Sequence, residues 1–143
     1  MSSTGTTNQN NALKANRNES SLIYAGPLAV GDYSSEMGPF KARIKSLRLT
    51  PAMLEFEITG SDGGAGDFEV SGVAISKADG KYRCSKALLH YPGIDVEDIP
   101  TDFTFEVREV AAQDQRFCYV SLGWIEEGTG TWIAHGLLGT KPD

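Results

Sequence analysis

Residues 40–58 of the sequence, FKARIKSLRLTPAMLEFEI, contain two runs in which apolar and polar residues alternate. Alternation with a period of two is typical of a β-strand that buries one of its faces. Between the two runs, proline is the second residue of TPAM at positions 50–53, where its fixed φ suits a type I turn. This stretch therefore predicts an antiparallel hairpin that turns at residues 50–53.

The alternation also sets the register of this predicted hairpin. Leu49 faces Leu54 beside the turn, but farther on the apolar phase of the first strand slips by one residue. A β-bulge that places Lys45 and Ser46 together against Glu57 restores the phase. Because bulges occur where sheets coil into closed barrels, this one favours closure. The predicted pairs are Leu49–Leu54, Arg48–Glu55, Leu47–Phe56 and Ile44–Ile58.

Further strand-like runs follow along the chain, and Gly or Pro turn signals separate them. No stretch shows a convincing helical period over about ten residues. The pattern predicts an all-β fold, a single-domain antiparallel meander of seven or eight strands. We favour a closed β-barrel over a β-sandwich, and by analogy the barrel is calycin-like, although the Gly-x-Trp that such barrels carry ahead of their first strand is absent. The strand-like runs are residues 40–49, 54–58, 67–71, 81–91, 103–108, 116–125 and 131–138.

The first part of the chain differs in composition from the rest. Residues 1–20 are rich in Ser, Thr, Asn and Gln and contain no aromatic residue. Such a segment cannot bury enough apolar surface to offset the entropy of ordering. We therefore expect a disordered polar arm over residues 1–20 and a β-barrel or β-sandwich domain over residues 21–143. The arm is either an inert leader or a segment that orders on a partner subunit.

Residues 117–138, FCYVSLGWIEEGTGTWIAHGLL, predict the last hairpin of the meander. Pairing its two strands around the central glycine sets Trp124 directly opposite Trp132. On the other face the same register sets Ser121 opposite His135. The Trp face continues with Cys118, Val120, Leu122, Ala134 and Leu138, and the second face carries Phe117, Tyr119, Ile125, Ile133 and Leu137.

Both faces of this hairpin are apolar, whereas a strand pair with one face in water alternates with polar residues. We therefore expect the second face to be covered, either by residues 22–33 or by another subunit, because exposed apolar patches usually mark interfaces. Alternatively, the small residues Gly123, Ala134 and Gly136 beside the tryptophans open a ligand cavity within the barrel. The candidate ligand or partner surface consists of Trp124, Trp132, Tyr119, Ile133, His135 and Leu137.

No group of residues reaches the specificity of a catalytic or metal site. The glycine-rich run 60–66 lacks the Gly-Lys-Ser/Thr and the following helix of a phosphate-binding loop. The acidic run 92–101 does not match a calcium-binding loop. Ser121 and His135 resemble a nucleophile and a base, but no Gly-x-Ser-x-Gly turn accompanies them. We therefore expect no catalytic residue, no metal and no cofactor.

The formal net charge of −6 argues against a general nucleic-acid binder. The basic stripe Lys41, Arg43 and Lys45 has no aromatic residues between its members, so we expect a solvated strand face. No apolar run approaches the roughly 20 residues that span a bilayer, and residues 1–21 lack the apolar core of a signal peptide, so we expect a cytoplasmic protein. Cys84 and Cys118 fall in predicted strands and are expected to be buried free thiols.

The function that the sequence favours is a non-catalytic binding or interaction module built on a small β-barrel. Such a module engages a protein partner or a small apolar ligand, and we expect a homo-oligomer or a protein partner. The first alternative is a structural subunit of a larger homo-oligomeric assembly that uses the N-terminal arm. The second alternative is a small barrel enzyme that uses His135, Ser121 or Tyr119.

Overall fold

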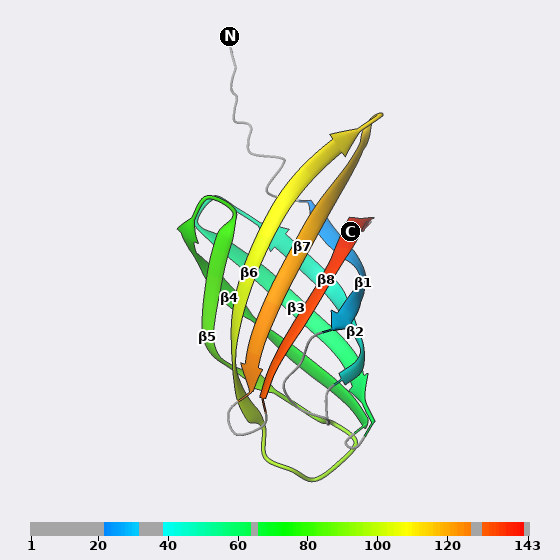
Figure 1. Ribbon diagram of the computed structural model, residues 1–143, viewed down its shortest axis with the longest axis vertical. Coiled ribbons are helices and arrows are strands. Elements are labelled where there is room, and N and C mark those ends of the chain that lie inside the picture. Colours follow the sequence, from blue (N-terminus) through cyan, green and yellow to red (C-terminus); the bar gives the residue numbers. More distant parts are fainter. Residues whose placement is uncertain (1–21, 32–38, 64–65, 127–129, 142–143) are drawn as a thin grey trace.

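The structure is a computed structural model that describes residues 22–31, 39–63, 66–126 and 130–141. The expected arm, residues 1–20, lies outside these ranges. Within them the chain forms eight β-strands (Figure 1). The strands are β1 (Ile23–Gly31), β2 (Pro39–Leu49), β3 (Met53–Asp62), β4 (Gly66–Ala78), β5 (Lys81–Leu89), β6 (Ile99–Ala112), β7 (Gln115–Glu126) and β8 (Gly130–Lys141).

Each strand pairs antiparallel with the next, and β1 pairs with β8, so the meander closes into a barrel (Figure 1). The predicted all-β meander and the preference for a barrel over a sandwich are confirmed. Closure is made by β1, whose Ala29 faces His135 of β8. Residues 22–33 are one of the two covers that the sequence predicts for the last hairpin. Their described part instead forms a strand in the barrel wall, beside β8 rather than over it.

The hairpin of β2 and β3 has the predicted register. Leu49 faces Leu54, and the register shifts by one residue between Ile44 and Ser46, where Ser46 faces Glu57. At the turn, the Thr50 amide donates a hydrogen bond of 2.9 Å to the carbonyl oxygen of Met53. The bulge therefore keeps the apolar side chains of both strands on the inner side of the barrel wall.

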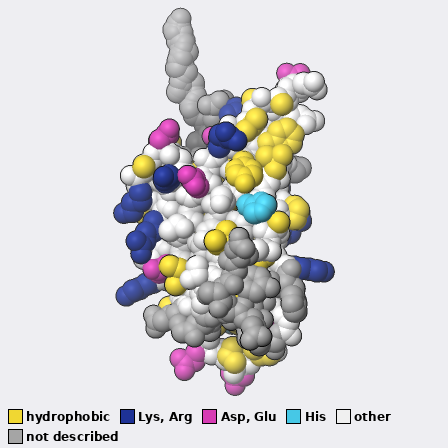
Figure 2. All heavy atoms as spheres, viewed as in Figure 1, with side chains coloured by type: hydrophobic (Ala, Val, Ile, Leu, Met, Phe, Trp, Pro, Cys, Tyr) yellow, Lys and Arg dark blue, Asp and Glu magenta, His cyan; other side chains and the backbone are white. Residues whose placement is uncertain are grey.

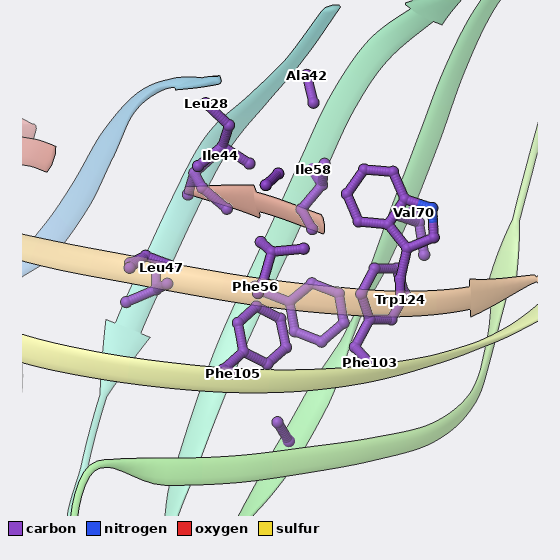
Figure 3. Close-up of a cluster of buried hydrophobic side chains, with 14 of the residues drawn as sticks. Leu28, Ala42, Ile44, Leu47, Phe56, Ile58, Val70, Phe103, Phe105 and Trp124 are labelled. Carbon is purple, nitrogen blue, oxygen red and sulfur yellow. The ribbon is translucent and has the colours of Figure 1, made fainter. Parts of the chain in front are cut away.

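Aromatic side chains from β3, β6 and β7 fill the middle of the barrel (Figure 3). The ring of Phe56 lies 5.2 Å from that of Phe103 and 4.9 Å from that of Phe105, measured between centroids. The ring of Phe103 in turn lies 5.8 Å from that of Trp124. Tilted pairs at these separations are favourable beyond the area that they bury. The core is therefore a packed aromatic cluster that β-branched and leucine side chains surround.

Tyr24 links β1 to β6, two strands that do not pair with each other in the barrel. Its hydroxyl donates a hydrogen bond of 2.6 Å to Glu109 Oε2. Burial raises the pKa of this phenol, and the hydrogen bond to Glu109 raises it further. The tyrosine therefore keeps its proton and remains a donor at any physiological pH.

Candidate functional site

The register of β7 and β8 confirms the predicted pairing of Trp124 with Trp132 and of Ser121 with His135. In the closed barrel, the Trp124–Trp132 pair and the Ser121–His135 pair lie on opposite sides of the wall. The tryptophans point inward, where Trp124 is 2% and Trp132 1% exposed. The remaining candidate residues, Tyr119, Ile133, His135 and Leu137, point outward and are exposed.

Among the described residues, the side chains beside the tryptophans are closely packed. Trp132 and Leu122 are almost completely buried. Ala134 is fully buried, and a Cβ added at Gly136 would lie 2.5 Å from the carbonyl oxygen of Pro27. Backbone from β1 therefore occupies the space beside Gly136, and the small residues do not open a cavity.

One polar atom of this interior is unusual. The indole nitrogen of Trp124 is buried and, in the described part of the chain, has no hydrogen-bond partner. An unpaired buried donor costs about 1–3 kcal/mol relative to a paired one. The aromatic packing of the Trp124 ring against Phe103 offsets part of this cost.

The outward side of β7 and β8 carries four large apolar side chains in one area. Tyr119 is 40%, Ile125 55%, Ile133 43% and Leu137 58% exposed. In Figure 2 apolar side chains gather over these strands, next to a histidine side chain. We call this surface the outer apolar face; it comprises Tyr119, Ile125, Ile133, Leu137 and His135.

The three strands that carry this face and its border contain no charged residue over most of their length. Residues 117–125 of β7, 131–139 of β8 and 23–31 of β1 include no Asp, Glu, Lys or Arg. Across the whole chain, 22% of residues are charged, so this gap is a distinct feature of the surface. The part that β1 plays is not predicted from the sequence, although the absence of charged residues from 23–31 indicates it.

Two hollows border the outer apolar face. The mouth hollow has a volume of about 750 Å³ and reaches from Tyr119 and Ser121 across β6 to Leu49, Tyr82 and Val107. The side hollow has a volume of about 430 Å³, and its lining combines Ser121, Gly123 and Ile133 of β7 and β8 with charged residues of β4, β5 and β6, namely Lys77, Lys81, Arg83 and Glu106. Ser121 and Gly123 are small residues on the outward side of β7, so the surface is recessed between Tyr119 and Ile125.

Among the described residues, the cysteine, serine and histidine side chains show no activated nucleophile. Cys84 and Cys118 are buried free thiols, as the sequence predicted. Burial raises the pKa of Cys118 to about 12, so this thiol is protonated and unreactive at neutral pH. Ser121 and His135 are cross-strand neighbours on an exposed surface, and no third group orients the histidine among the residues that the structure describes.

Over the same residues, no group of three or more His, Cys, Asp or Glu side chains is placed to hold a metal ion. The search for bilayer-spanning helices likewise finds none of sufficient length and apolarity among the residues described.

No family model matches this chain, and no curated protein matches it. Among solved structures, the chain is similar to the odorant-binding protein from bovine nasal mucosa, with 17% sequence identity and a TM-score of 0.39. The likeness covers 83% of this chain and 72% of that chain. A similarity of this size says nothing about the ligand or partner of this chain. The barrel itself is defined by the strand pairings.

Proposed function

We propose that this chain is a non-catalytic protein-interaction module that docks through the outer apolar face. The partner surface is apolar and uncharged. The observation that carries the proposal is the cluster of Tyr119, Ile125, Ile133 and Leu137, each 40–58% exposed on adjacent strands. Soluble monomers rarely expose contiguous apolar surface of this kind, and where they do it usually marks an interaction site.

The energy available at this face suits a reversible interaction. Complete burial of a Leu or Ile side chain is worth about 1.5–3 kcal/mol, so a half-exposed one gains about 1 kcal/mol on docking. The four large side chains therefore supply about 4 kcal/mol, and further contacts across β1 add to this. Part of the gain offsets the entropy lost on association, so a moderate affinity is expected.

The absence of charge defines the chemistry of the partner. A charged side chain brought against residues 131–139 of β8, which lie between the uncharged stretches of β7 and β1, would lose its hydration and gain no ion pair. Apolar and small polar groups lose little on the same transfer. The face therefore selects against charged surfaces and accepts an apolar one.

A photoreactive side chain placed on the face tests this proposal. Leu137→p-benzoylphenylalanine puts the probe on the face, and Val73→p-benzoylphenylalanine puts it on the outward side of β4, where the native residue is 43% exposed. On illumination in the native host, a discrete protein adduct is expected from position 137 and not from position 73. Adding Ile133→Ser to the position-137 variant should reduce the adduct. Equal adducts at both positions, or none at either, would overturn the proposal.

The side hollow supports a second candidate function, the binding of a small ligand that has both apolar and polar groups. Its volume of about 430 Å³ lies within the range of small-molecule sites, and its lining combines the half-exposed Ile133 with the charged residues Lys77, Lys81, Arg83 and Glu106. The dye 1-anilinonaphthalene-8-sulfonate should then bind with enhanced fluorescence, and Ile133→Ser should lower that signal while Val73→Ser leaves it unchanged. Identical fluorescence from the two variants would refute a ligand site in this hollow.

A further inference from the structure

The outward side of the barrel wall changes its chemistry from β5 to β8. The registers bring Arg83 of β5 opposite Thr104 of β6. Thr104 in turn lies opposite Gly123 of β7, and Gly123 faces Ile133 of β8. Three strand spacings separate β5 from β8, a span of at most about 14 Å. This row therefore runs from a cation, across a hydroxyl group and bare backbone, to an aliphatic side chain.

The side hollow lies over this row and has one basic wall. Among the described residues, its lining includes the cations of Lys77, Lys81 and Arg83 but a single carboxylate, that of Glu106. This local surplus of positive charge contrasts with the formal net charge of −6 of the whole chain. Figure 2 shows Lys and Arg side chains over β4 and β5 on the left and apolar side chains over β7 and β8. The hollow therefore lies between a basic edge and an apolar edge.

Two cations of the basic wall are available to a ligand. Lys81 Nζ lies 3.9 Å from Glu106 Oε2, and the two side chains are 61% and 66% exposed. Such exposed ion pairs contribute little free energy. Within the described ranges, the ammonium group of Lys77 forms no ion pair or hydrogen bond. Arg83 differs, because its guanidinium lies 3.4 Å from Asp102 Oδ2. An anion at Lys77 and Lys81 therefore displaces no strong interaction.

The floor and the far wall of the hollow suit an apolar group. Gly123 has no side chain, and the Ile133 side chain opposite it is 43% exposed. A flat ring or a short alkyl chain over Gly123 covers bare backbone and contacts Ile133. Thr104 Oγ1 lies 3.4 Å from the position that a Cβ at Gly123 would take, on the side of the basic wall. A hydroxyl donor therefore stands between the apolar floor and the cations.

We infer that the ligand of the side hollow is a small amphiphilic anion, in which a carboxylate, sulfonate or sulfate group is joined to an apolar ring or chain. Its anionic group binds at Lys77 and Lys81, and its apolar part lies over Gly123 against Ile133. This inference rests on the second candidate function, the binding of a small ligand, and names the charge of that ligand. A cation is repelled by the basic wall, and a neutral molecule gains no ion pair from it. The volume of about 430 Å³ suits a free small molecule.

Two dyes that differ in the anionic group test this inference. N-phenyl-1-naphthylamine has the same aromatic skeleton as 1-anilinonaphthalene-8-sulfonate but lacks the sulfonate. In fluorescence titrations of the full-length chain, we expect the sulfonate dye to bind at least about tenfold more tightly than the neutral dye. Added salt should weaken the binding of the sulfonate dye and should not weaken that of the neutral dye.

Substitution of the two lysines locates the anionic group. Lys77→Gln/Lys81→Gln should weaken binding of the sulfonate dye about tenfold and leave that of the neutral dye unchanged, because two charge-assisted contacts are lost. The matched control is Lys41→Gln/Lys45→Gln on the outward side of β2, which changes the net charge of the chain by the same amount. This control should bind both dyes like the wild type. All four lysines are exposed, so both variants should keep a melting temperature close to that of the wild type.

The outcomes separate this inference from the second candidate function. If both dyes bind equally well and Ile133→Ser weakens both, a small-ligand site stands and its preference for an anion is refuted. Equal losses of the sulfonate dye in the two lysine double variants also overturn the inference. Lysine-dependent binding to vesicles that contain anionic lipid, without binding of the monomeric dye, would refute a free small molecule as the ligand. If neither dye binds, the second candidate function itself fails.

Discussion

Replacing both Ile133 and Leu137 with serine removes the two aliphatic side chains that β8 contributes to the outer apolar face. Ile133 is 43% and Leu137 58% exposed, so about half of each side chain is still available for burial. Each is then worth about 1 kcal/mol on docking. The double substitution therefore removes about 2 kcal/mol from docking. This corresponds to about thirtyfold weaker association with the partner.

Photo-crosslinking in the native host measures this effect. With p-benzoylphenylalanine in place of Tyr119, the otherwise wild-type chain should give a discrete protein adduct, and the Ile133→Ser/Leu137→Ser variant should give far less. The matched control is Val73→Ser/Ile75→Ser on the outward side of β4, where the native side chains are 43% and 50% exposed. This control loses similar apolar area away from the face and should associate like the wild type.

Thermal unfolding of the same proteins separates docking from stability. Both double variants remove half-buried side chains of comparable exposure, so both should lose a similar and small part of the unfolding free energy, about 1–2 kcal/mol. The reasoning is refuted if the two double variants weaken association equally, or if neither changes it.

Three further predictions follow from other parts of the barrel. Asp114 has a φ of 68° in the β6–β7 turn, so Asp114→Gly should raise the unfolding free energy by about 1 kcal/mol, visible as a higher melting temperature. Gly136→Ala should destabilise the barrel by about 1–3 kcal/mol in urea denaturation because its Cβ would lie 2.5 Å from the Pro27 carbonyl oxygen, whereas Gly123→Ala should be nearly neutral. Burial raises the pKa of Cys118 from 9.0 to about 12, so between pH 9 and 12 the unfolded chain loses this proton before the folded one does. The wild type should then lose about 1.4 kcal/mol per pH unit more than Cys118→Ala, and equal slopes in urea denaturation at pH 8–11 would contradict this prediction.

Much of the fold was predictable because neighbouring strands pair through local signals. The proline turn at residues 50–53 and the phase slip beyond Leu47 were enough to place the bulge opposite Glu57. The pairing of Trp124 with Trp132 followed in the same way from the spacing around their turn. In both hairpins the register depends on residues close together in the sequence, so the period of two determines it.

The strand that closes the barrel was harder to predict. β1, with the sequence IYAGPLAVG, lacks the alternation of apolar and polar residues that identifies a strand. Its outward positions, among them Pro27 and Ala29, border the outer apolar face, so no polar residue marks its exposed side. Its partner β8 is distant in the sequence, with Ile23 facing Lys141, and no turn connects the two strands.

The sequence alone determined that the last hairpin has two apolar faces and which residues share each face. It did not determine which face the barrel encloses, because a period of two defines two sides of a strand without saying which is inside. Closure of the eight-stranded wall made that choice. The limited interior is filled by aromatic rings that pack with Trp124, while Tyr119, Ile133 and Leu137 remain outside with no charged neighbour on their strands. The tertiary structure therefore placed one apolar face of the hairpin in the core and left the other exposed.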